Sequence, residues 1–210
     1  MIQYKTTNRL FNGQYQYKVV LIVPGASLFR NGDMAVTLRL LKEVNLQSNS
    51  TTLFYKSKIN TQEDLDYGFA LQALLSKMDD YRLRVENPWI SIYTNSKKDV
   101  NRLVKLNPDQ IKYVSNPPES GNLISGTVIL PKINFEYKVT LGKTTHENSA
   151  FIEWAQGNNK VKLTKSCIKE LTREYSWGGA YFYISGEKNL LVAKMHLGGS
   201  INKIERVVKS

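Results

Sequence analysis

The sequence predicts an α+β protein of two similar lobes, each a small mixed sheet with packed helices. Three observations lead to this fold class. Segments with strand periodicity alternate with segments of helical periodicity. A stretch rich in Pro, Gly, Ser and Asn interrupts the chain at 116–122. The order of elements then begins again, so we expect one lobe over 1–118 and a second over 119–210.

The first half of the N-terminal lobe contains two strand-to-helix units. The β-branched run 15–23 ends in a Pro-Gly turn and predicts a buried strand. Apolar residues at helical spacing follow Asp33, which is predicted to be the N-cap of a helix. Residues 51–59 predict a second strand. Thr61, three residues before Asp64, predicts the start of the next helix.

The second half of this lobe is predicted to hold a strand, a helix and a last short strand. Residues 82–95 have strand character, and Pro88 places that strand at a sheet edge or gives it a bulge. Ser96 is the expected N-cap of the helix that follows, and an Asn-Pro step ends it. Residues 111–114 predict the final strand.

The C-terminal lobe repeats much of this order. The predicted strand 135–143 resembles 15–23, because each carries a Tyr-Lys-Val step within an apolar run. A short helix is expected at 146–157, and 161–175 parallels the second helical region of the first lobe. Such parallels are what an internal duplication produces, although the sequence leaves a chance similarity open.

The clearest internal similarity is a gapless alignment that places Tyr93 on Tyr183. The same register superposes Lys98 on Lys188, Val100 on Leu190, Ile111 on Ile201 and Val114 on Ile204. One element is expected to differ between the lobes. Residues 190–197 alternate in the strand period, which predicts a strand there and a hairpin turn at 185–188.

Composition points to a soluble, intracellular protein. Cys167 is the single cysteine, so neither an intramolecular disulfide nor a zinc site of several cysteines can form. The N-terminus lacks the apolar core of a signal peptide, and the longest apolar run, 19–23, is too short to span a bilayer. We therefore expect a cytoplasmic protein without membrane contact, in the host cytoplasm if it is phage-encoded.

The formal net charge of +11 favours a polyanionic partner. Basic side chains gather in several segments, and Tyr181 and Tyr183 share one face of a predicted strand opposite the apolar Phe182 and Ile184. Those tyrosines stack on bases if they are exposed and are packing residues if they are buried. The candidate nucleic-acid-binding residues are Lys97, Lys98, Arg102, Lys160, Lys162, Lys165, Lys169, Tyr181, Tyr183, Lys188 and Lys194.

Signatures of catalysis are weak. The two histidines, His146 and His196, have no Cys or His neighbour at ligand spacing, so we expect no metal and no cofactor. Nucleotide-binding and hydrolase motifs are absent from the sequence. Glu136 and Lys138 have the residue types of a nuclease site but not a distinctive pattern. No catalytic residue is assigned.

The sequence therefore predicts a non-catalytic protein that binds DNA or RNA through basic faces and exposed tyrosines. A composition rich in Lys, Asn and Ile is compatible with a phage-encoded protein. The alternative is accordingly a viral structural, assembly or host-directed factor that binds a protein partner or forms a homo-oligomer. A metal-dependent nuclease is the third possibility.

Overall fold

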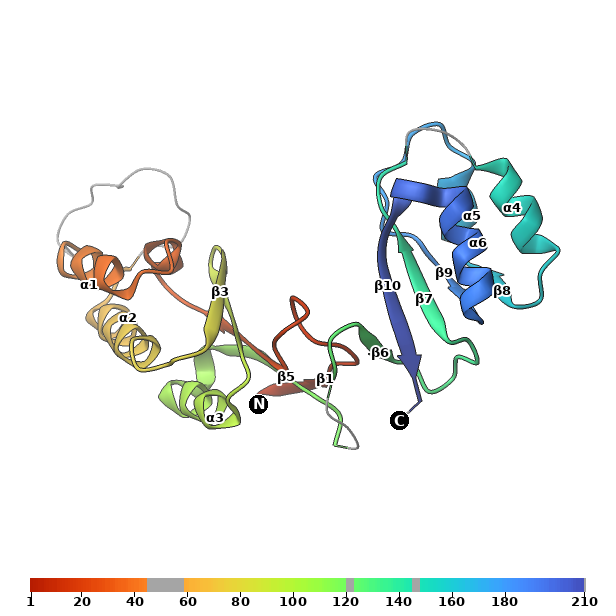
Figure 1. The fold of residues 1–210 in the computed structure, drawn as a ribbon. Coiled ribbons are helices and arrows are strands. Elements are labelled where there is room, and N and C mark those ends of the chain that lie inside the picture. The colour runs from red at the N-terminus through yellow and green to blue at the C-terminus, as the bar shows by residue number, and fades with distance from the viewer. Residues whose placement is uncertain (45–58, 120–122, 145–147, 210) are drawn as a thin grey trace. The chain divides into compact units, whose positions relative to one another are not determined.

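The computed structural model describes residues 1–44, 59–119, 123–144 and 148–209. The chain forms two compact units, Met1–Asn122 (unit 1) and Leu123–Ser210 (unit 2), and each contains a five-stranded sheet (Figure 1). The α+β class with two similar lobes is confirmed. Most of the strand predicted at 51–59 lies outside the described residues. Among the described residues, no helix is long and apolar enough to cross a membrane.

Unit 1 has the strand order β1-β5-β2-β4-β3, with β1 parallel to β5 and the other neighbours antiparallel. Its strands are β1 (Gln3–Thr6), β2 (Tyr17–Ile22), β3 (Tyr81–Glu86), β4 (Trp89–Thr94) and β5 (Ile111–Asn116). Its α-helices are α1 (Met34–Lys42), α2 (Gln62–Leu75) and α3 (Lys97–Leu106), and its short 3₁₀ helices are η1 (Ala26–Phe29) and η2 (Pro108–Gln110).

Unit 2 has the equivalent order β6-β10-β7-β9-β8, with one parallel pair, β6 and β10. Its strands are β6 (Thr127–Ile129), β7 (Tyr137–Leu141), β8 (Val161–Leu163), β9 (Tyr181–Ile184) and β10 (Ile201–Val208). Its helices are α4 (Ser149–Gln156), α5 (Lys165–Leu171), α6 (Glu187–Leu197) and the 3₁₀ turn η3 (Gly198–Ser200).

The two sheets match in register as well as in order. Tyr93 pairs with Lys18 in unit 1, and Tyr183 pairs with Lys138 in unit 2. The strands β5 and β10, which come last in the sequence of their units, have an irregularity at the same place. One extra residue, Lys112 in β5 and Asn202 in β10, interrupts the pairing there. The gapless alignment predicted from the sequence therefore agrees with the strand pairing.

Local signals placed the helix starts correctly. Asp33 accepts hydrogen bonds from two backbone amides at the start of α1. Thr61 and Asp64 form a reciprocal capping box at α2, and Ser96 accepts from the amide of Asp99 at α3. These caps satisfy amides that have no partner within the helix, which is why such short motifs fix a helix boundary.

The strand predicted at 190–197 is wrong, because these residues belong to the helix α6. The buried residues of this segment, Leu190, Ala193 and Leu197, recur at helical spacing and pack against the core. The same residues therefore also fit a hydrophobic period of 3.6. The hairpin turn predicted at 185–188 is wrong too. Gly186, with φ of 83°, instead joins the end of β9 to the start of α6.

Two further predictions need correction. The single strand expected over 82–95 is a hairpin of β3 and β4, joined at the cis peptide bond Asn87–Pro88. Pro88 therefore lies in the turn, where no ladder amide is needed. The segment 161–175 is not helical from its start, since its first residues form β8 before α5 begins. As a result, α5 separates β8 from β9, whereas β3 and β4 are adjacent in the chain.

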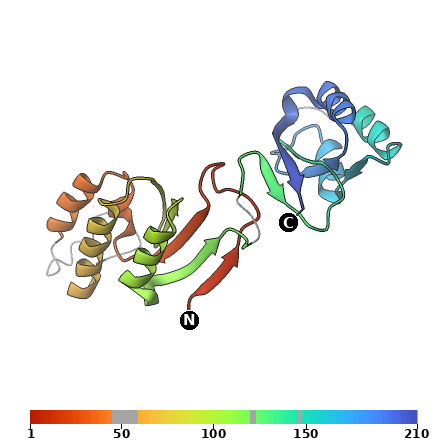
Figure 2. The ribbon, with the colours of Figure 1, turned by 60° about the horizontal axis from the view of Figure 1, so that its bottom comes forward.

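In each unit the helices cover one face of the sheet. The core of unit 1 joins alternate strand residues such as Val19 and Ile92 to residues of all three α-helices, which Figure 2 shows grouped beside the sheet. In unit 2, Val139 and Phe182 pack in the same way against residues of α4, α5 and α6. Because strand side chains alternate, the opposite face carries the residues between these core positions.

The buried thiol of Cys167 makes the stability of unit 2 dependent on pH. Burial, with a smaller contribution from the charge of Glu170, raises the thiol pKa from 9.0 to about 12. Above pH 9 the unfolded chain therefore loses this proton first, so the free energy of unfolding falls as pH rises from 9 towards 12. Denaturant titrations between about pH 8 and pH 10 should show this fall. It should be smaller in Cys167→Ala, and an unchanged slope would contradict the assignment.

Candidate nucleic-acid interface

Each sheet has a face on which no helix packs among the described residues, and we call it the open face. Alternation along the strands puts basic and aromatic side chains there. The open face of sheet 1 bears Lys5, Lys18, Arg82, Tyr93 and Tyr113, and that of sheet 2 bears Lys138, Lys162, Tyr181, Tyr183 and Lys203. These two sets form the candidate interface.

A row of three residues recurs at equivalent positions on both open faces. In sheet 1, Lys18 pairs with Tyr93, which pairs on its other side with Arg82. In sheet 2, Lys138, Tyr183 and Lys162 occupy the same places. A tyrosine on the fourth strand therefore lies between a lysine on the central strand and a cation on the edge strand in both units.

On sheet 1 the ammonium groups lie over aromatic rings. The Nζ of Lys5 is 4.1 Å from the centre of the Tyr113 ring, and that of Lys18 is 5.4 Å from the same ring. At the end of the sheet, the Nζ of Lys112 is 3.5 Å from the centre of the Trp89 ring. These cation–π contacts hold positive charge at the surface of the sheet.

On sheet 2 the same chemistry recurs with one neutralising group. The Nζ of Lys138 is 4.1 Å from the centre of the Tyr181 ring. Lys203 forms a 2.7 Å ion pair with Glu205, a buried carboxylate that lies opposite Lys138 in the strand pairing. Glu205 takes the place of Ser115 in sheet 1. The open face of sheet 1 has its own neutralised cation, because Arg84 forms a 2.6 Å ion pair with Glu86 on the same face.

The central tyrosine of each row is covered by a ring from the segment before the central strand. Tyr15 lies 6.4 Å from Tyr93 between ring centres, and Phe135 lies 6.1 Å from Tyr183. Tyr183 is only 8% exposed. Burial raises its pKa, and a hydrogen bond with Tyr181 adds to the effect. Tyr183 is therefore a packing residue, whereas the half-buried Tyr181 lies nearer the surface.

The predicted site residues fall on different sides of the two units. Lys162, Tyr181 and Tyr183 share the open face of sheet 2, and Lys160 directly precedes β8. The remaining candidates lie on helices, which pack on the opposite face. These are Lys97, Lys98 and Arg102 on α3, Lys165 and Lys169 on α5, and Lys188 and Lys194 on α6. Arg102 also forms a 3.0 Å ion pair with Asp99.

Several open-face residues were missed in the sequence, although one signal pointed to them. Lys18 and Lys138 occupy the repeated Tyr-Lys-Val step. The valine of each step is buried in the core, so alternation directs the lysine to the other face. Arg82, Tyr113 and Lys203 become recognisable only once the neighbouring strands are known. The same holds for Lys5 and Trp89.

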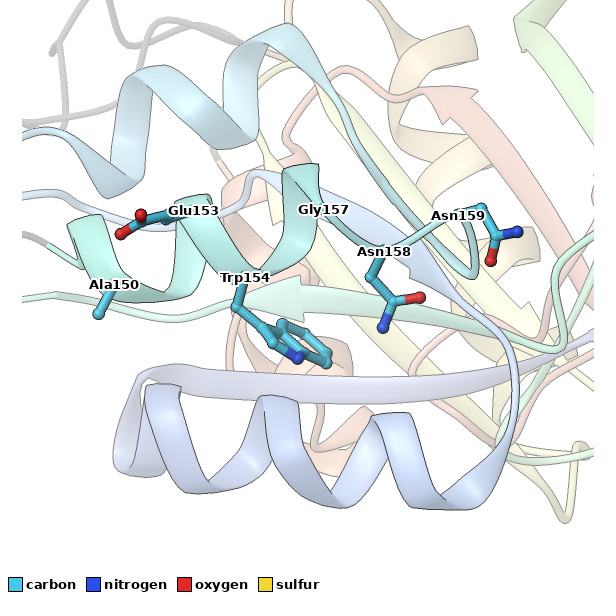
Figure 3. Close-up of a pocket in the computed structure, with 6 residues that line it drawn as sticks. All are labelled: Ala150, Glu153, Trp154, Gly157, Asn158 and Asn159. Carbon is cyan, nitrogen blue, oxygen red and sulfur yellow. The ribbon is translucent and has the colours of Figure 1, made fainter.

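Surface depressions occur in both units. One, of about 790 Å³, lies beside α4 (Figure 3). It is lined by Ala150, Glu153, Trp154, Gly157, Asn158 and Asn159. Glu153 is its one ionisable residue, and Asn158 donates a 3.1 Å hydrogen bond to Asn189. A second depression, within unit 1, includes the predicted site residue Lys97 together with Lys5.

The carboxylate proposed for a nuclease site has a structural role. Glu136 accepts a 3.2 Å hydrogen bond from the amide of Gly186, just before α6. Within the described ranges, no group of three His, Cys, Asp or Glu side chains is arranged to hold a metal ion. Comparison with protein-family models, curated proteins and solved structures finds no match. The two open faces are therefore the candidate functional surfaces of this protein.

Proposed function

We propose that the protein binds nucleic acid without cleaving it and that the two open faces are its binding surfaces. One observation supports this most directly. The row of lysine, tyrosine and a second cation occurs at the same register positions on both sheets, as Lys18, Tyr93 and Arg82 and as the equivalent residues of unit 2. The two cations of each row can contact phosphates in the same way on both sheets, whereas the tyrosine between them is buried.

The chemistry of these faces suits a phosphate backbone. Lys and Arg side chains that neutralise phosphates release condensed counterions, which favours binding at low salt. Half-buried rings beside them, Tyr113 and Tyr181, offer apolar surface to sugars and bases. The overall charge of +11 acts in the same direction by attracting a polyanion over longer range. We place this activity in the cytoplasm, that of the host if the protein is phage-encoded.

A protein-interaction role is the second candidate, and one observation favours it. Leu191 and Met195 are exposed on the outer side of α6, one helical turn apart. Such a pair suits contact with a protein partner or a second copy, as in a viral structural or assembly factor. A size shift in solution that does not depend on nucleic acid would favour this role.

The proposed function predicts binding that weakens steeply with salt. Fluorescence anisotropy with labelled single- and double-stranded DNA and RNA should show affinity at low salt that falls several-fold for each doubling of salt. Because the proposed function is binding without cleavage, the nucleic acid should remain intact when magnesium is added. Absence of binding to all four ligands at low salt would contradict the proposal, and magnesium-dependent cleavage would indicate a nuclease instead.

A further inference from the structure

Unit 2 exposes a second aromatic cluster outside the open faces, formed by Tyr175, Trp177 and Lys143. Trp177 is 83% exposed, the highest value among the Phe, Tyr and Trp side chains in the described part of the chain. The Nζ of Lys143 lies 5.0 Å from the centre of the Tyr175 ring and 5.4 Å from that of Trp177. We call these three residues the Trp177 platform.

The backbone holds this platform in place. Ser176, between the two rings, is buried and exchanges two 3.1 Å backbone hydrogen bonds with Thr144. Its hydroxyl also accepts from the amide of Gly178. Gly178 has a φ of 82° and packs so closely on Gly142 that a Cβ would lie 2.5 Å from its carbonyl atoms. The exposed rings therefore project from a well-fixed segment.

Contact with Tyr175 restrains the Trp177 ring and leaves most of that ring open to solvent. Tyr175 meets Trp177 edge to face, with ring centres 5.5 Å apart and an interplanar angle of 89°. A ring held in this way loses little conformational entropy when a partner stacks on it. The backbone just after Trp177 continues the β7–β9 ladder, because the amide of Gly179 donates to the carbonyl of Leu141 and the amide of Leu141 donates to the carbonyl of Ala180.

We propose that the Trp177 platform stacks an unpaired base, so that the protein prefers single-stranded nucleic acid; this rests on the proposed nucleic-acid binding. A wide exposed ring beside a lysine matches a base and its neighbouring phosphate. In a duplex the base faces are already stacked and are not available to Trp177. Large apolar side chains that are exposed in a free protein often mark a binding site, and a stacked base would cover the Trp177 ring in the complex.

The test compares Trp177→Ala with the unaltered chain on single strands and duplexes of the same sequence and length, as DNA and as RNA. The alanine variant should lose about tenfold in affinity for the single strands and remain within about twofold on the duplexes. Trp177→Phe should restore most of the loss, because it retains a stacking ring. Met195→Ala is the matched control, since it removes another exposed large side chain of unit 2.

Four outcomes separate the two proposals. Loss of single-strand preference in Trp177→Ala, with rescue by Trp177→Phe, supports the inference. Unchanged single-strand affinity in Trp177→Ala overturns it while leaving salt-sensitive binding, and hence the proposed function, intact. An equal loss on single strands and duplexes also overturns it, because the contact would then be to the backbone. Absence of binding by the unaltered chain overturns both proposals.

Discussion

Reversing the charges of two open-face cations is expected to lower the affinity for nucleic acid by roughly a hundredfold at low salt. The double variant combines Arg82→Glu with Lys162→Glu. Both residues are exposed and occupy the equivalent edge position of the repeated row. The slope of log affinity against log salt should become shallower by about one to two, because phosphate contacts are lost in both units. Anisotropy titrations at several salt concentrations measure both quantities.

The matched control is the pair Lys98→Glu and Lys165→Glu, which changes the net charge equally. These lysines lie in the first turns of α3 and α5, where a carboxylate suits the helix dipole, so the fold should tolerate them. They were predicted from the sequence as binding residues, but they lie on the helical sides of the units. A loss of affinity as large as that of the first pair would contradict the assignment to the open faces.

Gly178→Ala is expected to destabilise unit 2 by about 3 kcal/mol or more. The new Cβ would meet the backbone of Gly142 at 2.5 Å, and the residue would also be held at a φ of 82°. The thermal midpoint should fall by about 10 °C or more. Tryptophan emission reports this transition if Trp89 in unit 1 is first replaced by phenylalanine, because the other two tryptophans, Trp154 and Trp177, both lie in unit 2.

Gly179→Ala supplies the control for this prediction. Gly179 has a similar φ of 92°, but nothing lies within 4 Å of its would-be Cβ. Its substitution should therefore cost only the backbone strain, about 1–2 kcal/mol. If the two variants are equally stable, the close approach between Gly178 and Gly142 does not exist, and the rigid support proposed for the Trp177 platform is lost with it.

Local patterns in the sequence were sufficient for much of the fold. Caps such as Asp33 and Ser96 act within a few residues, so no tertiary information is needed to place them. The alignment of Tyr93 with Tyr183 also predicted matching sheets, because residues that share a register position in a sheet face similar surroundings. The strand prediction for 190–197 was wrong because eight residues are too few to distinguish a hydrophobic period of 2 from one of 3.6.

The amino-acid sequence alone was enough to predict the α+β class, the repeated order of strands and the basic character that favours a polyanion. Which cations lie on the same face of a sheet became clear only from the tertiary structure. Lys162 joins Tyr181 on the open face, whereas Lys165, three residues later, lies on a helix against the other face. That division depends on which face of each sheet the helices cover. The choice is made by packing between segments far apart in the chain, and so no local pattern records it.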